Sequence, residues 1–243
     1  MSLTITYPPL RIVAALLMIV IGVSVHHTET LLLLLAVGQG WIGVYRVPLS
    51  QFWRRLRLAV PFILFSFVFF SFYEHGAMIS IAPFLQISVD GLGKAFVYSA
   101  RLVFTLQVLT LLFNGMPLPV FFQSLVQLKL PGIFVELMLF TLRFMEVIRD
   151  EALRMLQALR SRGMQRKTFF SLSAYLILSR LLGSLLLRSF QRSERIYMGM
   201  MSRGYRGIPP AQDLEPYQST DIARLLLWVL PVLGLWLLDL IYM

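Results

Sequence analysis

The sequence predicts an all-α, polytopic membrane protein with about five transmembrane helices, within a range of roughly four to seven, and with long helices outside the bilayer. Two observations support this prediction. Hydrophobic residues make up 58% of the chain and charged residues only 14%, whereas soluble domains carry about 25% charged residues. Long apolar runs also recur along the chain, and lipid can cover an apolar surface that water would not tolerate.

Five apolar runs are the candidate transmembrane helices. The first two are shorter than the ~20 residues that a span usually needs, so flanking residues would have to extend them. A second apolar run follows the first almost directly, which predicts a retained helix in place of a cleaved signal peptide. Pro231 in the last run can kink its helix. The runs cover residues 10–25, 30–45, 58–73, 95–113 and 222–243.

The basic residues predict how the chain is oriented in the membrane. Lys and Arg exceed Asp and Glu by 22 to 12, a formal net charge of +10. Lys and Arg are enriched in cytoplasmic loops, and here they are absent from 26–29, clustered in 46–57 and frequent in 114–221. The pattern predicts a multi-pass protein of the plasma (inner) membrane with a cytoplasmic N-terminus and an external C-terminus. It also explains the basic excess better than nucleic-acid binding does.

This topology divides the chain into three regions. Residues 1–116 would hold the first four transmembrane helices, 117–218 a cytoplasmic region with two long helices, and 219–243 the last transmembrane helix. The first long helix is expected from Ile133 to about Arg162, after a break at Pro131-Gly132, and would be roughly 45 Å long. The second is expected to begin near Ser171, and each changes from apolar to amphipathic along its length.

Both long helices are expected to end on the same short pattern. Arginine in the last turn followed by glycine is ordinary helix capping, and one such ending would need no further explanation. Two matching endings on cytoplasmic helices instead favour basic tips that dock into grooves of a partner, where arginine binds carboxylates in a forked geometry. The two endings are Ser161-Arg162-Gly163 and Ser202-Arg203-Gly204.

These endings resemble the two Ala-Arg-Gly-like motifs of the T component of energy-coupling factor transporters, which are ABC-type importers of vitamins and metal ions. In that family each motif ends one cytoplasmic coupling helix. Here serine stands where alanine is commonest, and the arginine and glycine are kept. The similarity is concentrated in residues 131–207. The family's Asp-Pro-Arg-x-Lys-like entry to the first span is reduced to Pro8, Pro9, Leu10 and Arg11.

The resemblance implies a non-catalytic coupling subunit without a cofactor or a metal of its own. It would join two cytoplasmic ABC-type ATPase subunits to a membrane-embedded, substrate-binding S component. Arg162 and Arg203 would anchor the coupling helices in the ATPases, and ATP-driven motion of the helix tips would pass to the S component. The imported substrate would be a metal ion such as cobalt or nickel, or a vitamin such as biotin. The S component would select it, so this chain's sequence does not distinguish among them.

An enzyme is the first competing class. No Walker A motif occurs in the sequence, so this chain is not the ATPase itself, and the absence of cysteine excludes thiolate chemistry. His26, His27 and Glu29 could bind a metal ion, but adjacent histidines chelate poorly and a solvated loop is the better interpretation. Glu136 could be a functional group within the membrane, or it could pair with Arg143 on the same helix.

A stand-alone channel or secondary transporter is the second competing class. Such a protein needs polar groups along its spans to line a path. The clear spans carry few of them, and the polar residues are concentrated in the two long helices. This distribution favours a coupling protein over a pore. The candidate polar residues within the spans are Gln39, Arg101, Gln107 and Asp239.

Overall fold

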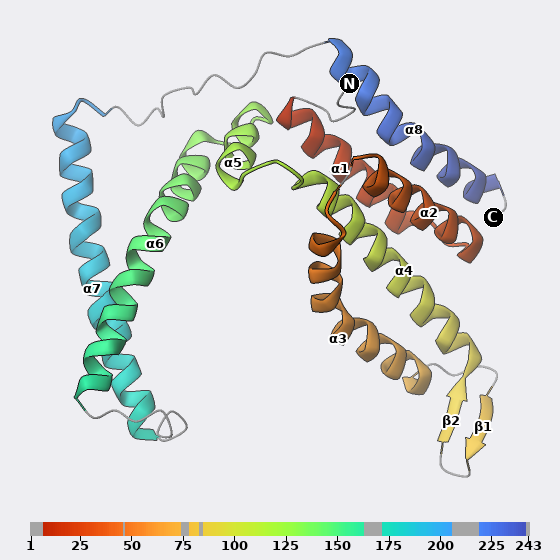
Figure 1. Cartoon of the computed structure of the whole chain (residues 1–243), viewed down its shortest axis with the longest axis horizontal. Helices are drawn as coiled ribbons and strands as arrows, with labels where there is room; N and C mark the ends of the chain where they lie inside the picture. Colours follow the sequence, from red (N-terminus) through yellow and green to blue (C-terminus); the bar gives the residue numbers. More distant parts are fainter. Residues whose placement is uncertain are drawn as a thin grey trace. The chain divides into compact units, whose positions relative to one another are not determined.

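A computed structural model describes residues 7–45, 47–73, 78–82, 85–162, 172–205 and 219–241. Within these residues the chain forms eight helices and one antiparallel pair of short strands (Figure 1). The predicted all-α membrane fold is confirmed, with the strand pair as an addition that the hydropathy pattern does not predict. The elements are α1 (Pro8–Ser24), α2 (Thr28–Val44), α3 (Leu49–Tyr73), β1 (Met78–Ala82), β2 (Leu85–Ser88), α4 (Val89–Leu112), α5 (Leu118–Gln127), α6 (Gly132–Ser161), α7 (Leu172–Ser202) and α8 (Ser219–Ile241).

Each of the five predicted apolar runs coincides with one helix: α1, α2, α3, α4 or α8. Three of them, α3, α4 and α8, are long and apolar enough to cross a membrane. Helices α1 and α2 have 17 residues each. At ~1.5 Å per residue they reach roughly 25 Å, slightly less than the ~30 Å hydrocarbon core. The structure therefore supports a membrane protein, and the count of five spans stays a prediction.

Two helices begin earlier than the apolar runs predict. Helix α3 begins at Leu49 and includes Arg54, Arg55 and Arg57, which the sequence assigns to a loop. Helix α4 begins at Val89 and includes Asp90 and Lys94 in its first turns. Hydropathy detects only the lipid-facing part of a helix, so it misses helical turns that extend into the polar interface.

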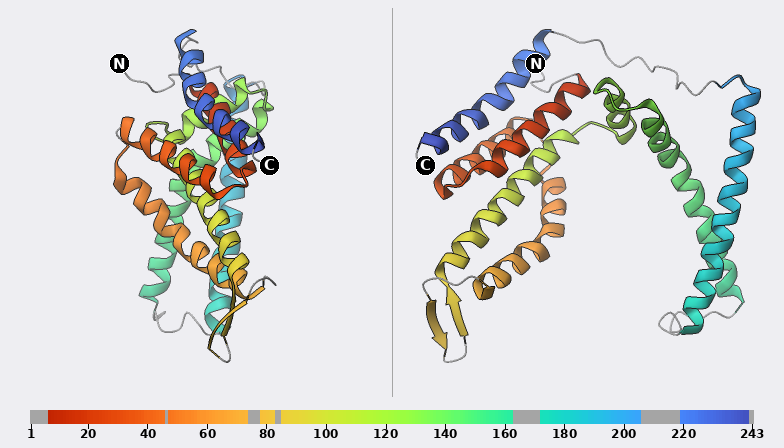
Figure 2. Two further views of the ribbon diagram at one scale, coloured as in Figure 1. Left: turned by 90° about the vertical axis from the view of Figure 1, so that its right-hand side faces the viewer. Right: turned by 180° about the vertical axis from the view of Figure 1, so that it is seen from behind.

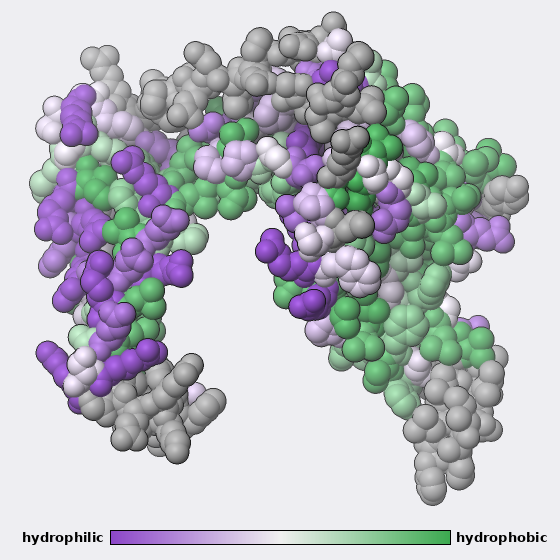
Figure 3. Space-filling model, viewed as in Figure 1, coloured by the Kyte–Doolittle hydropathy of each residue, from purple (hydrophilic) through white to green (hydrophobic). Residues whose placement is uncertain are grey.

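The chain divides into two compact units, which are described separately. The first contains Met1–Phe121 and Asp213–Met243, and the second contains Phe122–Gln212. In the first unit α4 packs against α1, α2 and α3, and α8 packs against α1 and α2. Apolar side chains remain exposed on α3, including Phe62 and Phe65. Figure 3 shows hydrophobic residues over the helices of this unit, as expected for a surface that faces lipid.

Two glycines allow the helices of the first unit to approach closely. A Cβ atom at Gly22 of α1 would overlap the ring of Phe104, and one at Gly38 of α2 would overlap the side chain of Gln107. Small residues at such contacts let membrane helices pack backbone to backbone. Phe104 and Gln107 are both fully buried on α4. Gln107 donates a hydrogen bond to the Leu35 carbonyl at 3.5 Å, so this polar group contributes to helix packing.

Arg11, near the start of α1, closes the C-terminal end of α4. Its side chain is buried, and its Nη2 donates hydrogen bonds to the carbonyls of Leu111 and, at 2.7 Å, of Asn114. The last carbonyls of a helix have no partner within the helix and carry its negative dipole end, so a guanidinium satisfies both needs. Arg11 thus holds together two helices that lie 100 residues apart in the sequence.

Replacing Arg11 by Leu is expected to lower the free energy of unfolding by about 2–4 kcal/mol, because buried carbonyl acceptors lose a charged donor. The measurement is the thermal midpoint of the purified chain in detergent. Arg11→Lys is the matched control, since its ammonium keeps a charged donor at this position and should lose less. Equal midpoints for the Leu variant and the wild type would show that the capping contact is not stabilising.

The turn between α1 and α2 is held by a charged residue from another helix. Asp239, at the end of α8, accepts hydrogen bonds from the backbone N–H groups of His26 and His27, at 2.9 and 3.1 Å. It also accepts the hydroxyl hydrogen bond of Thr30 at 2.6 Å. Asp239 therefore fixes the turn just before α2, a role that its sequence position does not indicate.

Candidate functional site

The second unit contains the two long helices, and their ends are close to the predicted ones. Helix α6 has 30 residues and begins at Gly132 after Pro131 at its N-cap, and helix α7 has 31 residues. Each is roughly 45 Å long. Figures 1 and 2 show the two helices running antiparallel and crossing side by side. The two predicted endings therefore lie at opposite ends of the pair.

The first ending is exposed. Ser161 is the last residue of α6 and donates its hydroxyl to the Gln157 carbonyl at 3.2 Å. Arg162 is the C-cap residue, and its N–H group bonds the carbonyls of Ala158 and Leu159, each at 3.2 Å. Gly163, the expected left-handed cap, lies outside the described residues. Arg162 thus lies at a regular helix end, and its side chain is exposed and can contact a partner.

Arg162 also lines a cavity of ≈ 410 Å³ between the end of α6 and the first half of α7. Two more arginines of α7, Arg180 and Arg188, line the same cavity together with apolar residues such as Leu159 and Leu181. Arg162 and Arg180 make the potential at this opening positive, which favours an acidic partner surface. The sequence assigns no common location to these three residues.

The second ending is a complete helix-closing motif. Gly204 has a φ of 79°, the left-handed region in which glycine is favoured. The N–H of Gly204 bonds the Met201 carbonyl at 3.0 Å, and the N–H of Tyr205 bonds the Met200 carbonyl at 3.1 Å. These two bonds define a Schellman motif with Gly204 at the position after the cap. Arg203 is the cap residue and is exposed, as is Ser202.

Tyr205 connects this second ending to the beginning of α6. Its hydroxyl donates a 2.5 Å hydrogen bond to Oε2 of Glu136. This hydrogen bond raises the pKa of the Tyr205 phenol above its ordinary value, and the negative charge of the carboxylate acts in the same direction. The sequence suggests Arg143 as the partner of Glu136, but the structure brings Tyr205 to it across 69 residues.

A carboxylate on α6 pairs with two arginines on α7. Glu151 lies 3.4 Å from Nη1 of Arg188 and 3.1 Å from Nη2 of Arg192, and its side chain is only 14% exposed. Exposed ion pairs typically contribute about 0–1 kcal/mol to stability. This cluster therefore sets the register between α6 and α7 and adds little to the stability of the pair. Sequence reasoning places Arg188 and Arg192 on one helix face but finds no partner, because Glu151 is 37 and 41 residues away.

The helix pair also exposes apolar surface. An apolar groove of ≈ 480 Å³ runs between α6 and α7, lined by Phe140, Phe144 and Ile148 on α6 and by Ile196 on α7. Further large apolar side chains are exposed toward the beginning of each helix. They include Ile133, Phe134 and Leu137 on α6, and Tyr175, Leu176, Leu182, Leu186 and Leu187 on α7.

Comparison with known proteins supports the resemblance seen in the sequence. The model of the cobalt transport protein family, CbiQ, matches residues 6–214. The energy-coupling factor transporter transmembrane protein EcfT of Bacillus subtilis (strain 168) is 25% identical over 209 residues, which is 82% of this chain and 79% of that protein. EcfT of Limosilactobacillus fermentum is 26% identical over 237 residues, which is 89% of this chain and 84% of that protein. An uncharacterised protein of Methanocaldococcus jannaschii is 23% identical over 229 residues, which is 89% of this chain and 76% of that protein.

Proposed function

The chain belongs to the cobalt transport protein family, and from that premise we propose that it is the T component, the membrane coupling subunit, of an energy-coupling factor transporter. It performs no catalysis itself and connects two cytoplasmic ATPase subunits to a substrate-binding S component. The observation that carries this proposal is the antiparallel helix pair of α6 and α7, which presents one basic tip at each end.

Each tip binds one ATPase subunit. Arg162 and Arg203 are exposed cap residues, so their guanidinium groups can reach carboxylates in a partner groove. The contact of Tyr205 with Glu136 places the second tip beside the first turns of α6. The tips are therefore separated by most of the length of α6, roughly 40 Å. A separation of this size suits two subunits, each holding one end of the pair.

The contacts between α6 and α7 transmit the motion of the tips. Glu151 lies about 16 Å along α6 from Arg162, and Arg188 lies about 22 Å along α7 from Arg203, given the ~1.5 Å rise per residue. When the ATPases close, the two tips move relative to each other, and the helices turn about the cluster of Glu151, Arg188 and Arg192. The apolar residues exposed along α6 and α7 then provide a surface for the S component.

The transported substrate is a metal ion, cobalt or nickel, or a vitamin such as biotin. The family's description as a cobalt transport protein favours the metal ion. The alternative of a stand-alone channel receives little support from the first unit. Arg11, Gln107 and Asp239 are among the buried polar residues of α1, α4 and α8, and each makes hydrogen bonds to another helix or to a turn between helices.

Co-purification tests this proposal. The full chain is expressed with an affinity tag together with the ABC-type ATPases and candidate S components of the same organism, and the membranes are solubilised in mild detergent. A complex of this chain with two ATPase subunits and an S component is expected, with ATP-dependent uptake in proteoliposomes. Uptake by the chain alone, with no ATPase retained, would instead identify a stand-alone transporter.

The orientation in the membrane is a separate prediction. A reporter fused after Met164 is expected to be cytoplasmic, and one inserted in the loop from His26 to Glu29 is expected to be external, because arginines are concentrated on the cytoplasmic side. Paired alkaline phosphatase and fluorescent-protein fusions measure both positions. An external reporter at Met164 would remove the tips from the compartment in which ATPases reside.

A further inference from the structure

The cavity between the end of α6 and the first half of α7, of ≈ 410 Å³, is formed by two facing helix stripes. Its lining includes Met155, Leu159 and Arg162 on α6, and Ile177, Arg180 and Ser184 on α7. Within each helix these residues are spaced three or four positions apart, so each set lies on one helix face. Arg162 and Arg180, which are 18 residues apart in the sequence, therefore meet at the same opening.

The positive charge of Arg162 and Arg180 is not compensated within the helix pair. Arg188, the third arginine of the lining, lies 3.4 Å from the carboxylate of Glu151. Arg162 and Arg180 are exposed, and neither makes an ion pair among the described residues. After Glu151 the next carboxylate in the sequence is Glu194, so neither helix near the cavity, nor the segment that connects them, supplies one.

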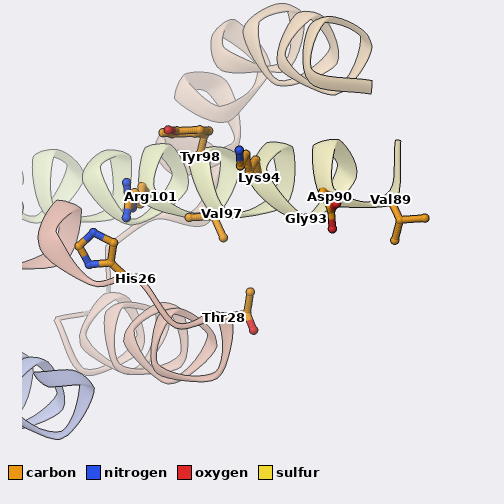
Figure 4. A pocket seen from close by; sticks show the side chains of 9 residues that line it. All are labelled: His26, Thr28, Val89, Asp90, Gly93, Lys94, Val97, Tyr98 and Arg101. Atoms are coloured by element: carbon orange, nitrogen blue, oxygen red, sulfur yellow. The ribbon is translucent and has the colours of Figure 1, made fainter. Parts of the chain in front are cut away.

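The polar cavity of the first unit differs in this respect. Figure 4 shows Asp90, Lys94 and Arg101 of α4 among its lining residues. Asp90 and Lys94 each interact with other groups of the chain, and Arg101 donates a 2.7 Å hydrogen bond to the Val25 carbonyl. These residues already have partners within the chain, whereas the side chains of Arg162 and Arg180 are available to another molecule.

The lining fits an acidic side chain better than a small free anion. Two guanidinium groups can bind the oxygens of one carboxylate in forked geometry. Met155, Leu159 and Ile177 give the cavity apolar walls, which the methylene groups of an acidic side chain can contact. A free phosphate would leave these walls in contact with water. The cavity therefore suits a protein segment that carries Asp or Glu.

The place of the cavity identifies that protein. Arg162 lines the cavity and is also the cap residue of the first tip, so a protein that binds this tip also covers the cavity. The second tip is different, because the hydroxyl of Tyr205 bonds the carboxylate of Glu136 two residues after Arg203. A carboxylate of the chain itself thus lies near the second tip, and the first tip has the more positive surface.

We propose that this cavity receives an acidic side chain of the ATPase subunit bound at the first tip, with Arg180 as a second anchor beside Arg162. The proposal rests on the function proposed above and extends it, because neither of the two Ser-Arg-Gly endings includes Arg180. Arg162 binds the carboxylate from α6 and Arg180 binds it from α7. The ATPase subunit therefore contacts both helices at the first tip and is held there by two cations.

The affinity of the full chain in lipid nanodiscs for the purified ATPase subunits tests the proposal. Arg180→Gln is expected to weaken binding about tenfold, because a charge-assisted contact is lost. Arg180→Lys should weaken binding less, since the positive charge is kept without the forked geometry. The matched control is Arg154→Gln, which removes the same charge from an exposed position of α6 outside the cavity and should leave the affinity unchanged.

A cross-link identifies the occupant of the cavity directly. The chain contains no cysteine, so Ser184→Cys introduces a single thiol in the lining, which can carry a benzophenone maleimide. Illumination of the assembled complex is expected to join this site to an ATPase peptide that contains Asp or Glu, as identified by mass spectrometry. Ser179→Cys, exposed on the same helix outside the lining, is the control and should give little of this product.

The outcomes separate this proposal from the proposed function. A wild-type chain that binds no ATPase subunit would overturn both. If the wild type binds the ATPase subunits and Arg180→Gln binds them equally well, Arg180 is not an anchor, and only the present proposal fails. A cross-link from Ser184→Cys to lipid in place of an ATPase subunit would overturn it in the same way, because the cavity would then face the bilayer.

Discussion

Replacing both Arg162 and Arg203 by Glu is expected to abolish ATPase binding and substrate uptake while the chain still inserts into the membrane. Each arginine is an exposed cap residue of a long helix, so its loss should not disturb folding. Losing one member of a desolvated charge pair at an interface costs about 2–5 kcal/mol, and reversing the charge adds repulsion. With both tips changed, the complex should no longer survive purification.

The measurements are co-purification of the ATPases and uptake in proteoliposomes, with membrane insertion checked by extraction and the thermal midpoint. The control is Arg149→Glu combined with Arg154→Glu, which changes the charge of α6 equally at exposed positions between the tips. Each single variant should retain one ATPase contact and so bind more weakly without losing all association. Normal uptake by the Arg162→Glu, Arg203→Glu variant would refute the assignment of these tips.

Replacing Glu151 by Arg is expected to reduce uptake about tenfold while both tips still bind ATPases. The substitution places a third positive charge beside Arg188 and Arg192, where two ion pairs stood. Each pair is partly exposed, so we count about 0.5–1 kcal/mol for each loss and a similar amount for the repulsion. The total of about 1.5–3 kcal/mol corresponds to a change of at least about tenfold in the population of the native helix crossing.

A rescue variant separates this pairing from a general effect of charge. Glu151→Arg combined with Arg192→Glu restores one opposite-charge pair and the original net charge of the cluster, and should recover most of the uptake. Glu146→Arg is the control, because Glu146 is exposed on the same helix. Uptake, ATPase binding and the yield of a disulfide engineered across the helix crossing are measured for each. Wild-type uptake in Glu151→Arg would show that the cluster does not transmit motion.

The elements that sequence analysis predicts well are those set by local signals. The expected first long helix, 133–162, agrees with α6 within one residue at each end, because Pro131 precludes a helical hydrogen bond at its start and the amphipathic pattern continues to its end. Gly204, one of the glycines expected to end the second helix, has a left-handed backbone conformation. The roles of the tip residues stay predictions, and Gly163 lies outside the described residues.

The contacts that sequence analysis misses join residues far apart in the chain. Tyr205 and Glu136 are 69 residues apart, and Asp239 bonds the α2 N-terminus across more than 200 residues. Arg11 illustrates the difficulty: its position suggests only a reduced entry motif, whereas the structure shows it capping α4. An isolated charge near an apolar run has many potential partners, and a single sequence does not distinguish among them.

The sequence by itself determined that this chain is a helical membrane protein with two long amphipathic helices, because hydropathy, helical periodicity and helix-breaking residues act over one to a few turns. Only the tertiary structure decided that these helices run antiparallel with their basic ends apart, and that Glu151 pairs with Arg188 and Arg192. Those features depend on which helix faces are buried together. That choice is made by packing across the whole chain, where each local pattern allows several arrangements.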